Sequence, residues 1–356
     1  MIDFLVIGGG IAGVSAAAGL SELGSVTLLE AEDTLAFHTS SRSAAMFEQY
    51  YGQPSTIALN EASYAFHDEN GILSPRGMML VGSADRADEF AADQKRMQLD
   101  SISMTEARNM VPILDEAVLD RAAYHAGASD MDTDKLIQTF AGIARKNGAV
   151  FSTRMQVDGI THTDAGWAVR AGPSSFEARN LVNAAGAWVD QIAELAGIPP
   201  FGFTPLRRSM ARIPAPGGHD VSGWPMMFGP GEEWYAKPDA GALIVSPAEE
   251  DPTTPHDAYA DDMVLAEGLA RYEANVTEPV TRLLGSWAGL RTFSPDRTLV
   301  LGPDPRDPSF IWCAGQGGYG MQSSPGASQL LADLLGGAAS ALSSTTIAEL
   351  SPRRFI

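Results

Sequence analysis

Residues 2–30 read IDFLVIGGGIAGVSAAAGLSELGSVTLLE and are the most informative stretch of the chain. Residues 2–7 form a short apolar run of the kind that becomes a strand buried on both faces of a parallel sheet. Glycines and a run of small residues follow, and this run is expected to form a helix that stops at Gly24. Residues 25–29 are a second apolar strand, which ends in Glu30. The stretch therefore predicts one strand–helix–strand unit.

The turn between the first strand and the helix satisfies the pattern G-x-G-x-x-G at Gly8, Gly10 and Gly13. Gly8 permits a tight turn, Gly10 lets the backbone approach a pyrophosphate, and Gly13 lets helix and strand pack closely. The helix N-terminus offers free N–H groups and a positive dipole end to phosphates. Glu30 can accept hydrogen bonds from ribose hydroxyls and would repel a 2′-phosphate. The turn therefore predicts a dinucleotide site and disfavours NADP.

Two further segments help to distinguish FAD from NAD. Residues 38–45, HTSSRSAA, follow the second strand in place of another plain strand–helix repeat, and their Ser and Arg side chains can supply further phosphate and flavin contacts. A second glycine cluster, GQGGYG at 315–320, lies near the other end of the chain. A cofactor held by both ends of a chain of this length is expected to be long and extended, which favours FAD.

The composition indicates a packed globular protein. The 356 residues are 45% hydrophobic and 19% charged, which excludes a disordered chain. The 24 Lys and Arg against 44 Asp and Glu give a net charge of −20, which repels nucleic-acid phosphates and anionic lipid. The single cysteine, Cys313, can form neither an internal disulfide nor a cysteine-based metal cluster, and no metal site is predicted. Without a long apolar run or an export signal, we expect a cytoplasmic protein with no integral membrane segment.

The pattern predicts an α/β fold of two discontinuous domains. One is an FAD-binding, Rossmann-like domain around a parallel sheet, and the other is a smaller α+β substrate-binding domain with a mixed or antiparallel sheet. Strand-like runs separated by Pro and Gly turns indicate that the second sheet is interrupted and then resumed. The predicted FAD-binding domain comprises 1–75, 134–204 and 286–356, and the predicted substrate-binding domain comprises 76–133 and 205–285.

Several motifs in order resemble those of the D-amino-acid oxidase superfamily of FAD-dependent amine oxidoreductases, and within it the bacterial D-arginine dehydrogenases. The likeness covers nearly the whole chain. It implies that a hydride leaves the Cα of a D-amino acid for flavin N5 and that water hydrolyses the imine to a 2-oxo acid and ammonia. It also implies non-covalent FAD, although some relatives attach flavin through a cysteine. The motifs are GGGIAG with Glu30, SRSAA at 41–45, VNAAGAW at 182–188, WAGLRTF at 287–293 and WCAGQGGYGMQ at 312–322.

The resemblance implies a set of residues around the substrate. Arg291 would clamp the substrate carboxylate, because a guanidinium is planar and always charged. Arg208 would be a second cation there, and Tyr235 a hydroxyl donor to the same carboxylate. Tyr51 would lie on the amine side, and the Gly318 carbonyl would accept an ammonium or imine N–H group.

Two of these assignments have a neighbour of the same type, since Arg207 precedes Arg208 and Tyr50 precedes Tyr51. The resemblance also implies the cofactor contacts. They are Gly8, Gly10, Ile11, Ala12, Gly13, Glu30, Ala31, Arg42, Ser43, Ala44, Val157, Ala185, Gly186, Trp188, Gly289, Gly317, Gly318, Tyr319, Gly320, Met321 and Gln322.

The residues after the second glycine cluster predict another helix. Ser324 is expected to be its N-cap and Pro325 its first helical residue. If this N-terminus points at the flavin pyrimidine ring, its dipole would stabilise the anionic reduced flavin.

The chain departs from the D-arginine dehydrogenase pattern in the substrate pocket. Met46 follows SRSAA in place of a histidine, and Met78 stands where that group has the glutamate that pairs with the substrate guanidinium. Together with Met226 and Phe228 they predict an adaptable apolar pocket for neutral or apolar D-amino acids, with poor use of D-arginine and D-lysine. Glu48 lies near the same face and could restore affinity for cations, but we expect it to point to solvent.

Two alternatives remain open. The first is an enzyme of the sarcosine or N-methyl amino acid oxidase type, which shares the fold and the arginine clamp. The second is a non-catalytic flavin-binding subunit of a larger complex. The predicted partner is a small-molecule amino acid and not a nucleic acid, with the electron acceptor left open among a quinone, another carrier and oxygen.

Overall fold

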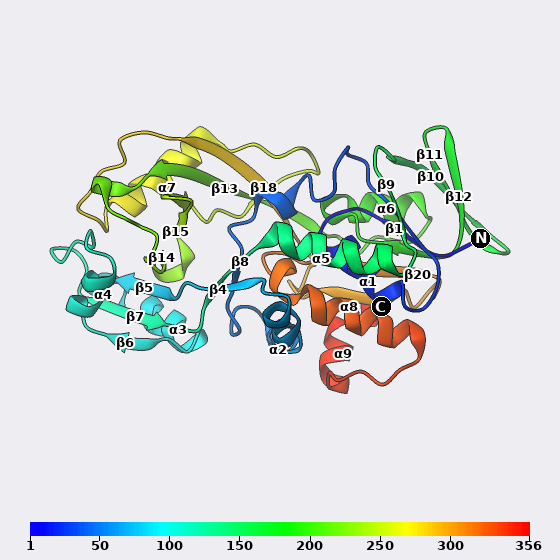
Figure 1. The fold of residues 1–356 in the computed structure, drawn as a ribbon, viewed down its shortest axis with the longest axis horizontal. Helices are drawn as coiled ribbons and strands as arrows, with labels where there is room; N and C mark the ends of the chain where they lie inside the picture. The colour runs from blue at the N-terminus through cyan, green and yellow to red at the C-terminus, as the bar shows by residue number, and fades with distance from the viewer.

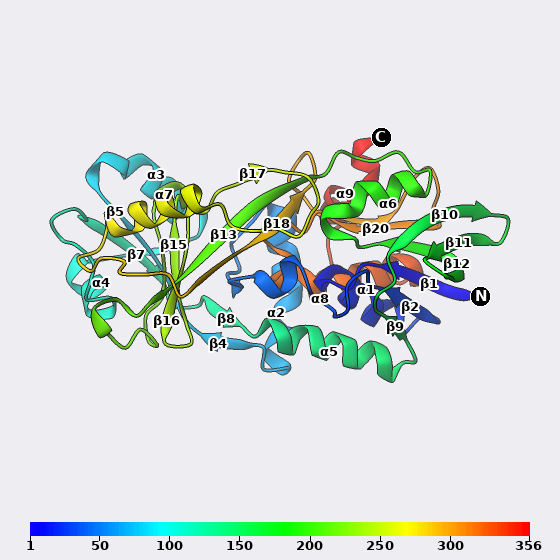
Figure 2. The same ribbon diagram turned by 90° about the horizontal axis from the view of Figure 1, so that it is seen from above.

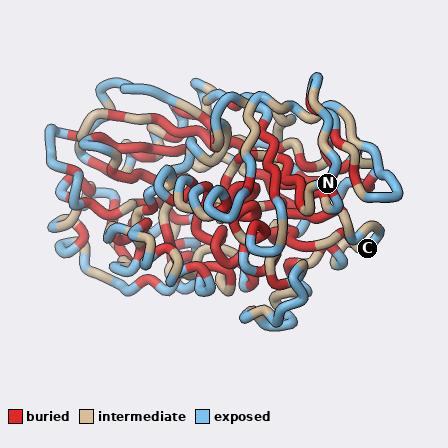
Figure 3. Tube along the Cα trace, turned by 45° about the vertical axis from the view of Figure 1, so that its right-hand side comes forward, coloured by how far each residue is buried: buried red, intermediate tan, exposed pale blue.

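Two large sheets lie side by side along the longest axis of the molecule, and each is the centre of one lobe (Figure 1). The computed structural model describes residues 1–356, and both chain ends lie in the lobe that contains β1. Buried segments are concentrated inside both lobes, with exposed segments at the periphery (Figure 3). None of the helices is long and apolar enough to cross a lipid bilayer.

The first lobe contains an eight-stranded sheet whose central strands β9, β2, β1, β12 and β20 run parallel. The antiparallel strands β10, β11 and β19 extend it. The predicted parallel sheet of the cofactor-binding domain is confirmed. The strands are β1 (Ile2–Ile7), β2 (Val26–Leu29), β9 (Val150–Ser152), β10 (Val157–Thr163), β11 (Gly166–Ala171), β12 (Ser174–Asn183), β19 (Val300–Pro303) and β20 (Phe310–Ala314).

Helices cover both faces of this sheet (Figure 2). The helices α1, α5 and α8 share one core cluster with the side chains of one face, whereas α6 packs on the opposite face. Helices α2 and α9 complete the lobe. The bounds are α1 (Ile11–Leu20), α2 (Pro54–Glu69), α5 (Thr133–Lys146), α6 (Val189–Leu195), α8 (Gly320–Gly336) and α9 (Ser344–Leu350).

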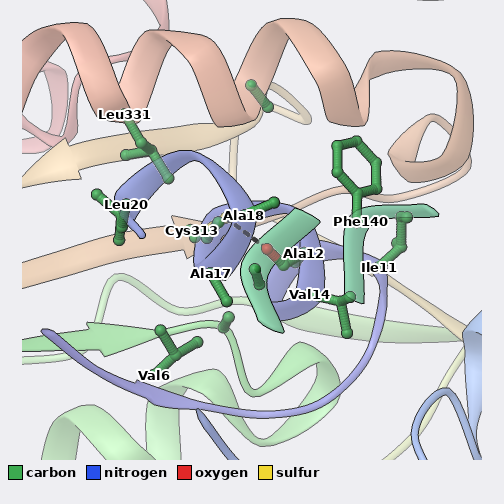
Figure 4. Packing of buried hydrophobic residues seen from close by; sticks show 14 of the residues in the cluster. Val6, Ile11, Ala12, Val14, Ala17, Ala18, Leu20, Phe140, Cys313 and Leu331 are labelled. Carbon is green, nitrogen blue, oxygen red and sulfur yellow. Dashed lines mark hydrogen bonds between the residues drawn. The ribbon is translucent and has the colours of Figure 1, made fainter. Parts of the chain in front are cut away.

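The helix α1 sits close to β1 because its inner face consists of small residues (Figure 4). A Cβ atom on Gly13 would collide with the carbonyl oxygen of Gly8, so helix and turn touch through backbone alone. The helix ends at Leu20, four residues before Gly24, and a turn leads from there into β2. The predicted strand–helix–strand unit is therefore present with a shorter helix.

The helix α8 begins earlier than the sequence predicts. Its first residue is Gly320, so Ser324 is not an N-cap and Pro325 lies inside the helix. A proline has no N–H and leaves the carbonyl one turn earlier without its helical donor. Here the hydroxyl of Ser324 donates to the carbonyl oxygen of Met321 at 3.0 Å, which satisfies that carbonyl.

The neighbouring helix α2 supplies two more bonds to the same stretch. The amide of Gly326 donates to the hydroxyl of Ser63 at 2.9 Å. The ring nitrogen Nε2 of His67 donates to the carbonyl oxygen of Gln322, also at 2.9 Å. These tertiary bonds replace helical ones and explain why the helix continues through a proline.

The second lobe contains a nine-stranded sheet formed by two separate parts of the chain. All of its pairs are antiparallel except β14 with β5, so the predicted mixed sheet is confirmed. Helices α3 (Ala87–Arg96), α4 (Met104–Met110) and α7 (Asp262–Glu273) surround it. The strands are β5 (Met78–Gly82), β6 (Asp100–Ile102), β7 (Arg121–His125), β13 (Thr204–Pro214), β14 (Met226–Phe228), β15 (Tyr235–Asp239), β16 (Ala242–Ser246), β17 (Asp251–Pro252) and β18 (Gly285–Phe293).

The strand β18 begins at one predicted domain boundary and pairs in the second sheet. It pairs antiparallel with β13 from Gly285 opposite Arg212 to Phe293 opposite Thr204. Residues 286–293 therefore belong to the second sheet, although the predicted division assigns them to the FAD-binding domain. The reason is the length of β13, whose unpaired edge needs a partner along its whole length.

A three-stranded sheet connects the lobes. It comprises β3 (Met46–Phe47), β8 (Ser129–Met131) and β4 (Leu73–Pro75) in that order. Its strands β4 and β8 lie between the two lobes (Figure 1).

Candidate active site

Three adjoining cavities run from the first lobe to the second. The first, of about 1300 Å³, extends from Glu30 to Trp188. The second, of about 820 Å³, shares Gly10 and Ser40 with the first. The third, of about 740 Å³, shares Arg291 with the second. The cavities therefore form one extended path that both ends of the chain contact.

The first cavity is organised by the turn after β1. The carboxylate of Glu30 accepts hydrogen bonds from the amide of Gly9 at 2.6 Å and from the amide of Glu32 at 2.9 Å. These bonds hold the carboxylate at the end of β2, where the sequence places a ribose contact. The predicted cofactor residues that line this cavity are Gly8, Gly10, Glu30, Ala31, Val157, Ala185, Gly186 and Trp188.

The second cavity is positively charged. No acidic side chain lines it, although the chain has a net charge of −20, whereas Arg42, Arg208 and Arg291 do. The N-terminus of α1 opens on it, and its N-cap residue, Gly10, has no side chain to occupy the free N–H groups. This arrangement fits a pyrophosphate. The predicted cofactor residues that line it are Gly10, Ile11, Ala12, Arg42, Ser43, Gly186, Gly289, Gly317, Gly318, Gly320 and Met321.

The sequence interpretation missed four polar residues of the second cavity. Ser40 accepts a hydrogen bond from the amide of Ile11 at 3.0 Å and therefore stands at the helix N-terminus. Each of the four lies within three residues of a selected position, and that proximity was the available signal. They are Thr39, Ser40, Thr292 and Gln316.

Some residues predicted to touch the cofactor have other contacts. Gly13 lines none of the three cavities and serves the packing of α1 on Gly8. The ring of Tyr319 packs on that of Tyr51, with centroids 5.2 Å apart. Gln322 lines the third cavity, but its side-chain amide donates to the carbonyl oxygen of Tyr51 at 3.2 Å. Ala44 also lines the third cavity and not the second.

Arg42 lines the second cavity while its guanidinium is already paired. It contacts the carboxylate of Asp257 at 2.5 Å and donates to the carbonyl oxygen of Ala258 at 2.8 Å. It therefore fastens the loop before α7 to the segment that follows β2.

Arg291 is the charged centre of the site. Arg207 and Arg208 pair with Asp251 at 2.7 Å and Glu250 at 3.3 Å, whereas no carboxylate forms an ion pair with Arg291. Burial disfavours its charge, but nearby Tyr51 and other groups outweigh that effect and keep its pKa above the ordinary value. Burial, together with the charge of Arg291, lowers the pKa of Arg208.

Both predicted tyrosines line the third cavity. The hydroxyl of Tyr51 donates to the carboxylate of Glu232 at 3.2 Å, and burial followed by that carboxylate raises the pKa of Tyr51. The hydroxyl of Tyr235 contacts only the sulfur of Met210, at 3.2 Å. Tyr50 does not line the cavity. Gly318, whose carbonyl oxygen is the predicted acceptor for the amine, lines both the second and third cavities.

The far wall of the third cavity contains the four predicted apolar residues, Met46, Met78, Met226 and Phe228, with Met97 in addition. Met226 and Met78 are register partners on β14 and β5, which brings distant parts of the chain to one wall. The pairing of these strands is not visible in the sequence.

The expectation that Glu48 points to solvent is wrong. This residue is 2% exposed and lines the third cavity. Its carboxylate contacts Nδ1 of His125 at 2.8 Å and accepts a hydrogen bond from the amide of Tyr50 at 3.2 Å. The physical reason is that β7 ends with a histidine beside the carboxylate, and this partner is remote in sequence.

Glu232 is a second acidic residue that the sequence interpretation missed. It lines the third cavity and pairs with Arg96 at 2.7 Å. It lies in a Pro-Gly turn after β14, and only the tertiary structure places this turn beside Tyr51.

Cys313 lies in the core beneath α1 and lines none of the three cavities (Figure 4). Its thiol is 3.5 Å from the carbonyl oxygen of Ala12. Burial raises the pKa of this thiol to about 12. The thiol therefore lies behind Ala12 and Gln316, which line the second cavity, and does not itself line the path along which a flavin would lie.

The fold and the continuous cavity define a dinucleotide-binding oxidoreductase of the flavoprotein class. Residues 3–334 match the family described as FAD dependent oxidoreductase, DAO, and the chain belongs to that family. FAD is its cofactor, and the residues that line the first and second cavities fit that molecule.

Known proteins show the breadth of the similarity. Over 215 residues the chain is 27% identical to the mitochondrial dimethylglycine dehydrogenase of Homo sapiens. This match covers 55% of this chain and only 24% of the length of the dehydrogenase. It is 23% identical to the glycine oxidase of Pseudomonas putida over 357 residues, with 94% of each chain covered. The crystal structure of glycine oxidase from Geobacillus kaustophilus has the same fold, with a TM-score of 0.81, 21% identity and coverage of 98% and 97%.

Proposed function

We propose that this FAD-dependent oxidoreductase oxidatively deaminates neutral or apolar D-amino acids to 2-oxo acids and ammonia. Oxidation of amino-type donors is the activity that the family supports. The observation that carries the proposal is the guanidinium of Arg291, which forms no ion pair with a protein carboxylate and lies where the cofactor path meets a largely apolar cavity. A guanidinium without a protein carboxylate is suited to a substrate carboxylate.

Arg291 binds the substrate carboxylate and fixes the distance of Cα from the cofactor path. The Tyr235 hydroxyl, which has only a weak sulfur acceptor, donates to the same carboxylate. Arg208 adds positive potential, although Glu250 already neutralises part of its charge. Holding the substrate in one orientation is the main contribution of such groups to the rate.

The amine is held on the opposite side of the substrate. The carbonyl oxygen of Gly318 accepts a hydrogen bond from the neutral amine, and Tyr51 closes the amine side of the cavity. Bound FAD supplies the acceptor for the hydride that leaves Cα. Water then hydrolyses the imine to the 2-oxo acid and ammonia, and Met46 and the other wall residues contact the substrate side chain.

The selectivity for neutral side chains follows from the wall of the third cavity. Met78 offers no charge to a guanidinium, Glu232 is already paired with Arg96, and the carboxylate of Glu48 is already in contact with His125. The likeness to D-arginine dehydrogenases, the preference for D-enantiomers and a cytoplasmic location remain predictions. An alternative of the sarcosine or N-methyl amino acid type has support from the similarity to dimethylglycine dehydrogenase and glycine oxidase.

Anaerobic mixing of the yellow holoenzyme with D- and L-amino acids, sarcosine and dimethylglycine tests the proposal. Neutral D-amino acids should bleach the flavin absorbance and release ammonia, whereas sarcosine should release methylamine or formaldehyde if the alternative holds. Bleaching by L-amino acids alone would contradict the enantiomer preference. Absence of bleaching by every compound would favour a non-catalytic flavin-binding subunit. Subsequent admission of air distinguishes an oxidase from a dehydrogenase.

A further inference from the structure

The carboxylate of Glu48 is a charged group in an otherwise apolar part of the third cavity. It lies with Met46, Met78, Met226 and Phe228 on the cavity wall, yet it is 2% exposed. Burying a carboxylate costs free energy unless donors satisfy its oxygens. The protein supplies two such donors, the amide of Tyr50 at 3.2 Å and Nδ1 of His125 at 2.8 Å.

A carboxylate has about four acceptor sites, so two protein donors leave it with unused capacity. No lysine or arginine pairs with Glu48, and the only basic side chain in contact with it is His125. Glu232, the other carboxylate of the cavity, also has two protein donors, but one of them is the permanently charged guanidinium of Arg96. Glu48 is therefore the carboxylate of this cavity that has no lysine or arginine partner, and its remaining acceptor sites could serve a ligand.

The position of Glu48 is also fixed. Its backbone amide donates to the side chain of Gln322 at 3.1 Å, and that side chain is tied to Tyr51. The ring of His125 lies close to the Gly127 backbone: a Cβ atom on Gly127 would be 2.7 Å from Nε2. A preorganised acceptor discriminates strongly between a ligand that carries a donor and one that lacks it.

We propose that Glu48 selects substrates whose side chain ends in a neutral hydrogen-bond donor, a hydroxyl or an amide N–H, at the end of an apolar stem. The methionines and Phe228 contact the stem, and the carboxylate accepts from the terminal group. This inference rests on the proposed function and narrows it, because it names the class of side chain. A neutral hydroxyl brings one donor, whereas an ammonium or guanidinium brings several, and the methionines and Phe228 beside Glu48 offer the others no acceptor.

Binding of non-reactive acids to the FAD holoenzyme tests the inference without turnover. We would measure the dissociation constants of 3-(4-hydroxyphenyl)propanoate and 3-phenylpropanoate from the perturbation of the flavin spectrum. The kcat/KM ratios of two matched pairs, D-tyrosine with D-phenylalanine and D-glutamine with D-methionine, would be measured in parallel. At least one pair should favour the donor by about tenfold or more, as expected of a bond to a charged acceptor.

The variants Glu48→Gln and Glu48→Met test whether Glu48 is responsible for the preference for a donor. In Glu48→Gln the preference should fall to about threefold, and in Glu48→Met it should disappear or reverse. The matched control is Glu232→Gln, which removes the other carboxylate of the same cavity and should leave the donor preference intact, whatever its effect on the rate. Flavin content and circular dichroism establish that each variant is folded.

Equal binding of both acids by the wild-type holoenzyme, with equal kcat/KM in both pairs, would overturn the inference even if the variants did not fold. A preference for the donor that survives in Glu48→Met would also overturn the inference. A preference for D-lysine over D-norleucine that is lost when Glu48 is substituted would overturn it as well. Failure of the proposed function is distinct, because then no amino acid would reduce the flavin, while the two acids could still be compared as ligands.

Discussion

The guanidinium of Arg291 lies directly against the backbone of Gly318, where a Cβ atom would be 3.0 Å from Nη1 and 3.2 Å from Cζ of the arginine. Arg291 comes from β18 of the second sheet, and Gly318 comes from the glycine cluster before α8. The two lobes thus meet at the atoms that would hold the substrate carboxylate and amine.

Substitution Gly318→Ala should displace the Arg291 guanidinium by a few tenths of an ångström without unfolding the chain. Because the clamp would move relative to the cofactor path, we expect KM for the substrate to rise about tenfold. Steady-state kinetics and the melting temperature of the variant provide the check. The matched control is Gly142→Ala, since no atom lies within 4 Å of a Cβ at that position.

Substitution Arg291→Lys should lower kcat/KM about a hundredfold or more, because a point charge replaces a planar bidentate donor. FAD content should stay near that of the wild type. The parallel variant Arg207→Lys changes an arginine that pairs with Asp251 and lines none of the cavities, so its kinetics should change little. Equal losses in both variants would contradict the assignment of the clamp.

Substitution Glu30→Ala should reduce FAD retention. The variant loses two acceptors for the amides of Gly9 and Glu32, as well as the group predicted to bind the ribose. The ratio of flavin to protein absorbance after gel filtration measures this. Glu22→Ala, at an exposed position beyond α1, should keep the wild-type ratio. Full retention of FAD in Glu30→Ala would contradict the assignment of Glu30 to the cofactor site.

The pH dependence of stability should contain a contribution from His67. Burial lowers the pKa of this histidine from 6.5 to about 4, because the charged form is disfavoured in the core. The unfolded chain therefore binds a proton that the folded chain does not, so the free energy of unfolding falls as the pH drops from about 6.5 to about 4. The loss is about 3 kcal/mol.

Urea unfolding of the wild type and of His67→Gln at several pH values measures this contribution. The glutamine amide can still donate to Gln322 but does not titrate, so the slope of stability against pH should be smaller in the variant. An identical slope in both proteins would show that other groups dominate the acid sensitivity.

Cys313 should not carry the flavin. Its thiol is buried in the core and has a pKa of about 12, so very little of it is thiolate near neutral pH. Acid precipitation should release all flavin into the supernatant, and Cys313→Ala should bind FAD like the wild type. Yellow colour that stays with the precipitated protein would contradict this.

The structural features that could be predicted from the sequence depend on residues that are close together in the chain. The run from Ile2 to Glu30 specifies strand, turn and helix within thirty residues, because apolar periodicity, glycine positions and a terminal acid all act over short distances. The start of α8 was predicted wrongly for the opposite reason. Ser324 and Pro325 read as a helix start, but Ser63 and His67 of α2 supply the bonds that carry α8 through the proline.

The substrate cavity likewise contains residues that could be predicted from the sequence and residues that could not. Arg291 and Met78 could be selected from the sequence because each lies within a recognisable motif. The environment of Glu48 could not be read there, since its partner His125 is 77 positions away. Glu232 was overlooked because a Pro-Gly turn carries no sign that it will lie beside Tyr51.

By itself the amino-acid sequence determined that this chain has a dinucleotide-binding strand–helix–strand unit, a second glycine cluster and an arginine suited to a carboxylate. Only the tertiary structure decided which side chains share a cavity: β18 pairs with β13 and brings Arg291 beside Arg208, and β7 brings His125 beside Glu48. The physical reason is that backbone geometry and hydrophobic periodicity are properties of neighbouring residues, whereas burial and pairing of charges depend on which distant strands become neighbours.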